Sequence, residues 1–161
     1  MRLLEYYTLA APDPFGFISP ETPTDFLFGN HIQLLGYTLP RGTTYSPADY
    51  LPISFYWKTD QPLTEDYVMT FFVADSADKV IVQSYDSQAL ANFLPTTSWP
   101  PNQPIQDNRA LQLPPDLPPG EYLLWLIIYH YTDTGIQRLP ITGNLVLPDN
   151  IAQLSKKIVI K

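Results

Sequence analysis

Apolar and polar residues alternate in short runs along most of the chain, and this is the period of a half-buried β-strand. The clearest run, residues 51–58, directs one series inward: Leu51, Ile53, Phe55 and Trp57. Tyr56 in the same run points outward, and Pro52 near its start indicates an edge or the first residues of a strand. Residues 66–74 repeat the pattern with a second inward series: Tyr67, Met69, Phe71 and Val73.

Further runs complete a set of strands. In residues 31–39 the alternation groups Ile32, Leu34, Gly36 and Thr38 on one face. A turn at 75–79 and a return at 80–85 predict a hairpin, and the proline-rich connection 88–103 crosses between two sheets. Strands are also predicted at 105–113, 122–131, 136–139 and 158–160. No segment has the apolar period of a long helix, and 149–155 suffices for one helical turn. The pattern predicts an all-β fold, an antiparallel β-sandwich.

Composition fits this architecture and sets the domain plan. The 161 residues are enough for one domain and include 18 prolines, which belong in loops, edges and strand starts. Residues 1–28 are punctuated by four of these prolines, so we expect a proline-rich N-terminal arm or linker there and the β-sandwich domain in 29–161. The chain has no cysteine, so the fold uses neither disulfides nor a thiolate metal site.

Charge and hydropathy exclude two classes of partner. The net charge of −7 repels phosphate backbones, and without a basic stripe we expect no nucleic-acid binding. The longest apolar run, residues 122–131, is half of the roughly 20 residues that a membrane helix needs. We therefore expect no membrane span within this chain.

Several motifs occur together in a fixed order: FGNHIQLLGYTL (28–39), SFYWKT (54–59), DYVMTFFVAD (66–75), VIVQSYD (80–86), PTTSW (95–99), DNRALQLPPDLPPGEY (107–122) and TGIQRLP (134–140). On these motifs residues 28–161 resemble a β-sandwich accessory domain of filamentous photosynthetic bacteria and their relatives. It often follows the membrane-embedded part of dolichyl-phosphate-mannose-type glycosyltransferases. Asn102 and Ile127 stand where that family usually has glycine.

The resemblance implies an immunoglobulin-like or carbohydrate-module-like sandwich of 7–9 strands. It also implies an extracytoplasmic setting, within a membrane-anchored or exported parent protein. It brings no catalytic residues and no cofactor. On this basis the expected function is that of a non-catalytic interaction or accessory domain, and the alternative is a carbohydrate-binding module that recognises envelope or extracellular glycans.

The same resemblance divides the strand at 122–131 into two faces. Its core-facing series is Tyr122, Leu124, Leu126 and Ile128, which leaves Leu123, Trp125, Ile127 and Tyr129 on the second face. The outer face of a sandwich sheet is normally polar. Because this face is apolar, we expect another group to pack over it and shield it from solvent. Three covers stay open: the N-terminal arm, a protein partner or second copy, and a ligand.

The sequence contains few residues in patterns that are typical of catalytic or metal sites. There are two histidines, His31 and His130, both at predicted strand ends, and the spacing of a zinc site is absent. No nucleophile motif is present, and the acidic residues fall at strand ends and in turns, where Asp commonly bonds the nearby backbone. We therefore expect no enzyme and no metal site.

Sugar-binding sandwiches stack pyranose rings on exposed aromatic side chains. The candidates for this role are Trp99 in the long connection, Tyr56 on an outward face, and Trp125 with Tyr129 on the second face of residues 122–131. Trp57 lies on an inward face and is expected in the core. For Trp99 the alternative is that it plugs one end of the sandwich.

Overall fold

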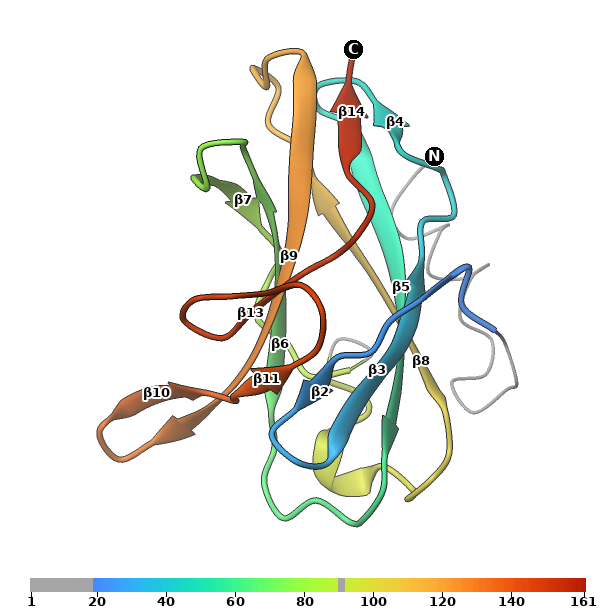
Figure 1. Cartoon of the computed structure of the whole chain (residues 1–161), viewed down its shortest axis with the longest axis vertical. Coiled ribbons are helices and arrows are strands. Elements are labelled where there is room, and N and C mark those ends of the chain that lie inside the picture. The colour runs from blue at the N-terminus through green and yellow to red at the C-terminus, as the bar shows by residue number, and fades with distance from the viewer. Residues whose placement is uncertain (1–18, 90–91) are drawn as a thin grey trace.

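The computed structural model describes residues 19–89 and 92–161, and two facing β-sheets account for their architecture (Figure 1). The first sheet consists of β1 (Thr22–Pro23), β2 (Leu27–Phe28), β3 (Ile32–Thr38), β5 (Tyr50–Thr59), β8 (Ile105–Gln112) and β11 (Ile141–Thr142). The second consists of β4 (Thr44–Tyr45), β6 (Val68–Ala74), β7 (Val80–Gln83), β9 (Gly120–Thr132), β10 (Gly135–Arg138), β12 (Val146–Leu147), β13 (Ile151–Gln153) and β14 (Ile158–Ile160).

This arrangement confirms the predicted all-β sandwich. Seven of the strands are four residues or longer, and the pairings are antiparallel except that of β4 with β14. The regular helical structure within the described ranges is the 3₁₀ turn η1 (Thr96–Ser98). In these ranges no helix is long and apolar enough to cross a membrane.

The core forms where the two predicted inward series meet. The inward series of β5, Leu51, Ile53, Phe55 and Trp57, and that of β6, Met69, Phe71 and Val73, are buried in the core. Tyr67, predicted to belong to the second series, lies before β6 and is only partly buried against the core. The rings of Phe55 and Phe71 meet edge to face across the two sheets at 5.9 Å. The core-facing series of β9 is confirmed as well, since Leu124, Leu126 and Ile128 are fully buried.

A β-bulge in β3 corrects one predicted face. The register with β5 shifts between Leu34 and Gly36, so Tyr37 rather than Gly36 or Thr38 follows Leu34 into the core. A Cβ on Gly36 would lie 2.5 Å from the carbonyl oxygen of Thr22, because β1 crosses closely at this point. The alternation rule failed here because a bulge inserts one residue and reverses the side-chain direction.

Two further boundaries differ from the sequence prediction. Residues 22–28, assigned to the arm, contribute β1 and β2 to the first sheet, so the sandwich begins before residue 29. Residues 151–153 form β13, paired with β9, where one helical turn was expected. Pro52 agrees with its prediction: β3 pairs with β5 only from Ser54 onward, so at Pro52 the strand has β8 alone as its neighbour.

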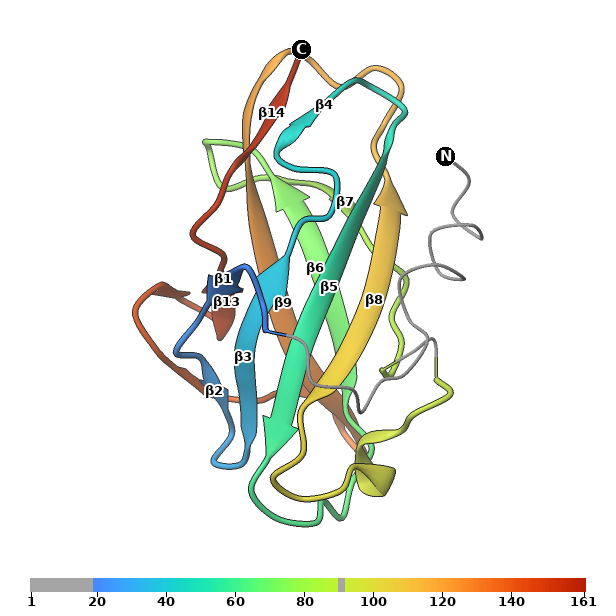
Figure 2. The same cartoon turned by 90° about the vertical axis from the view of Figure 1, so that its right-hand side faces the viewer.

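The two lateral sides of the sandwich are built differently. On one side the chain passes directly from β11, at the edge of the first sheet, to β12, at the edge of the second. On the other side the edge strands are β8 and β7 (Figures 1 and 2). Their connection, residues 84–104, runs from one sheet to the other, as the sequence predicted.

Candidate functional site

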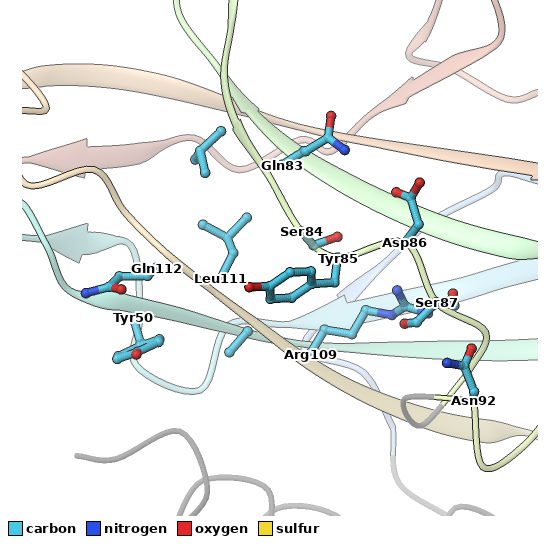
Figure 3. Close-up of a pocket in the computed structure, with 12 residues that line it drawn as sticks. Tyr50, Gln83, Ser84, Tyr85, Asp86, Ser87, Asn92, Arg109, Leu111 and Gln112 are labelled. Carbon is cyan, nitrogen blue, oxygen red and sulfur yellow. Dashed lines mark hydrogen bonds between the residues drawn. The ribbon is translucent and has the colours of Figure 1, made fainter.

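A cavity of about 710 Å³ opens on the β7–β8 side of the sandwich. Its size lies within the roughly 300–1,000 Å³ of typical ligand pockets. One wall is β8 from Arg109 to Gln112, and the opposite wall is the segment from Val82 to Ser87 (Figure 3). Tyr50 and Asn92 complete the described lining. The cavity therefore lies between the edges of the two sheets rather than on a sheet face.

Arg109 links these two walls. It lies opposite Ile53 in the register with β5, so its side chain points inward between the sheets. Its Nε donates to Asp107 at 2.8 Å, and its Nη1 donates to the carbonyl of Met69 on β6 at 2.8 Å. Its Nη2 donates to the carbonyls of Ser87 and Gln88 at 3.0 and 3.3 Å. Arg109 thus clamps the second sheet and the 84–88 segment to β8.

Asp107 supplies the counter-charge for this clamp. Its carboxylate is fully buried and also accepts a hydrogen bond from the indole nitrogen of Trp57 at 3.3 Å. A buried ion pair contributes little net stability, but loss of one member costs about 3–5 kcal/mol because the other charge stays uncompensated. The pair therefore fixes the geometry of this side of the sandwich.

The wall segment 84–88 has further anchors on the second sheet. The hydroxyl of Ser84 accepts from the backbone N–H of Phe71 at 3.0 Å. The carboxylate of Asp86 accepts from the hydroxyls of Thr70 at 2.6 Å and Tyr129 at 2.5 Å. Side chains from β6, β8 and β9 thus hold a segment that is itself outside the regular strands.

Tyr129 is electrostatically unusual. Burial raises the pKa of its phenol above the ordinary value, and the hydrogen bonds with Asp86 and Tyr131 raise it further. The phenol is therefore held protonated beside the Asp86 carboxylate, as the donor of that hydrogen bond.

The groups that face the opening are uncharged polar and aromatic side chains. Tyr85 is 93% exposed, and its ring extends into the opening while Asp86 and Gln83 point away from it (Figure 3). Tyr50 and Gln112 lie on the β8 side of the opening, and Asn92 lies at its other end. Such a lining offers aromatic faces together with amide and hydroxyl groups that both donate and accept hydrogen bonds.

The predicted platform residues Trp99 and Tyr56 are buried. Trp99 is 2% exposed, packs 6.3 Å from the ring of Trp57, and donates its indole N–H to the carbonyl of Leu94 at 3.1 Å. Its position agrees with the alternative of a plug in the sandwich. Tyr56 points away from the core as predicted, yet it is only 4% exposed. Neither ring offers an open face for stacking.

Trp125 and Tyr129 lie on the second face of β9, as predicted, and this face is buried within the chain. Trp125 is 4% exposed; it lies between Phe72 of β6 and Gln153 of β13, to whose Oε1 its indole nitrogen donates at 3.3 Å. Residues 19–28 belong to the opposite sheet and do not cover it, and residues 1–18 of the proposed arm lie outside the described residues. The apolar surface that stays exposed on this strand is Tyr131, beside Ile136 of β10.

Both histidines pair with carboxylates of the connection between β5 and β6. His31 Nδ1 lies 2.9 Å from Asp60, and His130 contacts Glu65. Each imidazole thus has a carboxylate partner that is distant in sequence. In the described part of the chain no group of three or more metal-ligating side chains comes together.

Sequence reasoning missed the cavity, although two signals pointed to it. In β8 the inward series contains Asp107 and Arg109 among apolar residues, and charged residues at core positions are rarely without a special role. The segment QSYDSQ (83–88) places Tyr85 in a polar run, where no core-facing pattern accounts for an aromatic ring. What the sequence could not show is that the two segments face each other.

Comparison with known proteins adds little. No protein-family model matches the chain, and a search of curated proteins found no match. Among solved structures, a crystal structure of the C-terminal domain of wzt is similar at 13% sequence identity and a TM-score of 0.44. The alignment covers 96% of this chain and 90% of that one. A likeness this remote assigns neither a family nor a ligand.

Proposed function

We propose that this chain is a non-catalytic accessory domain that binds carbohydrate in the cavity between the 82–87 segment and β8. The observation that supports this proposal is the 710 Å³ cavity with the exposed ring of Tyr85 at its opening and amides and hydroxyls in its lining. The apolar C–H face of a pyranose stacks on an aromatic ring, and its hydroxyls need groups that both donate and accept.

The test is binding of short oligosaccharides, measured by calorimetry on the whole chain. We expect Tyr85→Ala to weaken binding at least about fivefold, since truncation of an aromatic anchor costs more than about 1 kcal/mol. Phe93→Ala is the matched control, because Phe93 is also exposed but lies outside the cavity lining. Equal losses in both variants, or none in Tyr85→Ala, would contradict the assignment of the site.

The proposal includes an extracytoplasmic setting, within a membrane-anchored or exported parent. Its support is the sequence resemblance of residues 28–161. Protease treatment of intact spheroplasts of the source organism tests it. An extracytoplasmic domain is degraded without lysis, and protection until lysis would contradict this setting.

A second candidate function is self-association through the β9–β10 hairpin. It is favoured by the adjacent exposed side chains of Tyr131 and Ile136, at 69% and 61% exposure. Light scattering over a range of concentrations should then show dimers that Ile136→Lys dissociates. A strict monomer at every concentration would exclude it.

A further inference from the structure

The charged groups of the cavity narrow the class of sugar that fits it. Among the described lining residues the ionisable cation and anion are Arg109 and Asp86. The electrostatic interaction of a ligand with the cavity depends on whether each of these two charges is already compensated by a neighbouring protein group.

The Arg109 guanidinium is already engaged. Four hydrogen bonds hold its Nε, Nη1 and Nη2 atoms, one of them to the Asp107 carboxylate, and its side chain is only 6% exposed. A guanidinium has five N–H donors in a rigid fork, and it binds an anion best when two of them are free side by side. Here Asp107 neutralises the cation and backbone carbonyls occupy the fork, so Arg109 offers an anionic ligand little attraction.

The Asp86 carboxylate, by contrast, keeps its charge. Its two oxygens accept from the hydroxyls of Thr70 and Tyr129, which are neutral donors. These bonds stabilise the carboxylate without cancelling its negative charge. The side chain points away from the opening (Figure 3), so its repulsion acts on an anionic ligand from behind the wall segment, and the net charge of −7 of the whole chain adds to it.

The remaining polar lining is uncharged. It consists of hydroxyls and amides: Tyr50, Gln83, Ser84, Tyr85, Ser87, Asn92 and Gln112. From this charge pattern we infer that the cavity selects uncharged glycans and discriminates against glycans that carry carboxylate, sulfate or phosphate. The inference rests on the proposed carbohydrate-binding function and adds the chemical class of the ligand.

The experiment compares matched ligands on the whole chain. Neutral oligosaccharides of hexose or N-acetylhexosamine are titrated beside uronic-acid oligosaccharides of the same length, at 50 and 500 mM NaCl. We expect the acidic ligands to bind at least about tenfold more weakly at low salt, and the difference to shrink at high salt as repulsion is screened. The affinity for neutral ligands should change less than about twofold with salt.

Two variants locate the effect. Asp86→Asn keeps the shape and removes the negative charge, so it should raise the affinity for acidic ligands relative to neutral ones. Tyr85→Ala should weaken the binding of both kinds of ligand.

The outcomes separate the inference from the proposed function. Acidic ligands that bind as tightly as neutral ones, and are weakened by Tyr85→Ala, would overturn the inference and leave the proposed function standing. An unchanged ratio in Asp86→Asn would overturn the assignment of the discrimination to this carboxylate. Binding that survives Tyr85→Ala would show that the cavity is not the site, and no binding of any oligosaccharide would overturn both proposals.

Discussion

The two lateral sides of the sandwich join the two sheets in different ways. On the β11–β12 side the backbone itself crosses between the sheets, and the crossing is tight. A Cβ on Gly143 would lie 2.8 Å from the ring of Phe26, and the N–H of Asn144 donates to Asp25 at 3.2 Å. The apolar residues Phe26 and Ile141 are buried beside it. The short crossing leaves room on this side for a small cavity of about 130 Å³.

On the β7–β8 side the backbone connection is longer, residues 84–104, and the side chain of Arg109 fastens the two sheets beside it. The side chain reaches from β8 to backbone carbonyls of Met69, Ser87 and Gln88. A guanidinium spans the sheets at one level only, so the space beside it stays open as the cavity. The large cavity thus lies where the connection is long and a polar side chain fastens the sheets, whereas the short crossing on the other side leaves only a small cavity.

Removal of the Arg109 side chain tests whether the clamp holds the β7–β8 side together. Arg109→Met leaves the buried carboxylate of Asp107 without its cation, so we expect a loss of about 3–5 kcal/mol in the free energy of unfolding. Urea denaturation followed by circular dichroism measures it.

The matched control for this variant removes both charges. The double variant Arg109→Met with Asp107→Leu replaces the pair by apolar groups, and such replacements are often neutral or stabilising. It should therefore recover most of the lost stability. If the double variant is as unstable as Arg109→Met, uncompensated charge is not the cause of the loss.

The backbone crossing is tested by Gly143→Ala. Gly143 has φ +144°, a conformation that L-residues rarely adopt, and the added Cβ would press on Phe26. Backbone strain and overpacking together should cost about 2–4 kcal/mol. Gly42→Ala is the matched control, because Gly42 has φ +75° and nothing within 4 Å of its Cβ position. Equal losses in the two variants would mean that the contact with Phe26 is not what makes the crossing tight.

Most of the sandwich could be predicted because alternation is a local property. The inward series of β5, β6 and β9 follow from sequence positions two apart, and their members lie in the core, except Tyr67, which is only partly buried against it. Where a local rule is interrupted, prediction failed: the bulge at Gly36 turned Tyr37 inward, and residues 151–153 became a strand because β9 offered them a pairing edge.

The candidate site was beyond this reasoning because it depends on which distant segments meet. Trp99 looked like a platform because it is aromatic and lies in a long connection, but its ring packs on Trp57. Tyr85 ends the predicted return strand 80–85, where nothing in the sequence shows that the segment faces β8. Residue type indicates what a side chain can bind, whereas its exposure is decided by contacts far away in sequence.

The stability of the chain at alkaline pH depends on Tyr129, which holds the wall segment 84–88 through Asp86. The pKa of Tyr129 is raised in the folded chain by burial and by Asp86, so the folded state holds the phenol proton more tightly than the unfolded state does. Stability should therefore fall as the pH rises above about 10, the ordinary value for tyrosine. Tyr67 and Tyr122, whose pKa values are raised mainly by burial, act in the same direction.

Tyr129→Phe tests this directly. At neutral pH it should cost about 1.5–3 kcal/mol, the usual contribution of a hydrogen bond to a charged group. Its stability should also fall less steeply between pH 9 and 11 than that of the unmodified chain, as measured by thermal unfolding. An unchanged slope would show that the Tyr129 proton is not linked to folding.

Tyr85→Ala tests whether Tyr85 only binds ligand or also helps to hold the wall segment 84–88 in place. Tyr85 is almost fully exposed. The side-chain hydrogen bonds that hold the wall segment come from its neighbours Ser84 and Asp86. Tyr85→Ala should therefore change the free energy of unfolding by no more than about 0.5 kcal/mol, although it weakens oligosaccharide binding. Phe93→Ala is the control for an exposed ring outside the cavity lining. If Tyr85→Ala destabilised the chain as much as Arg109→Met does, the ring would be part of the clamp and the cavity would lose its aromatic binding surface.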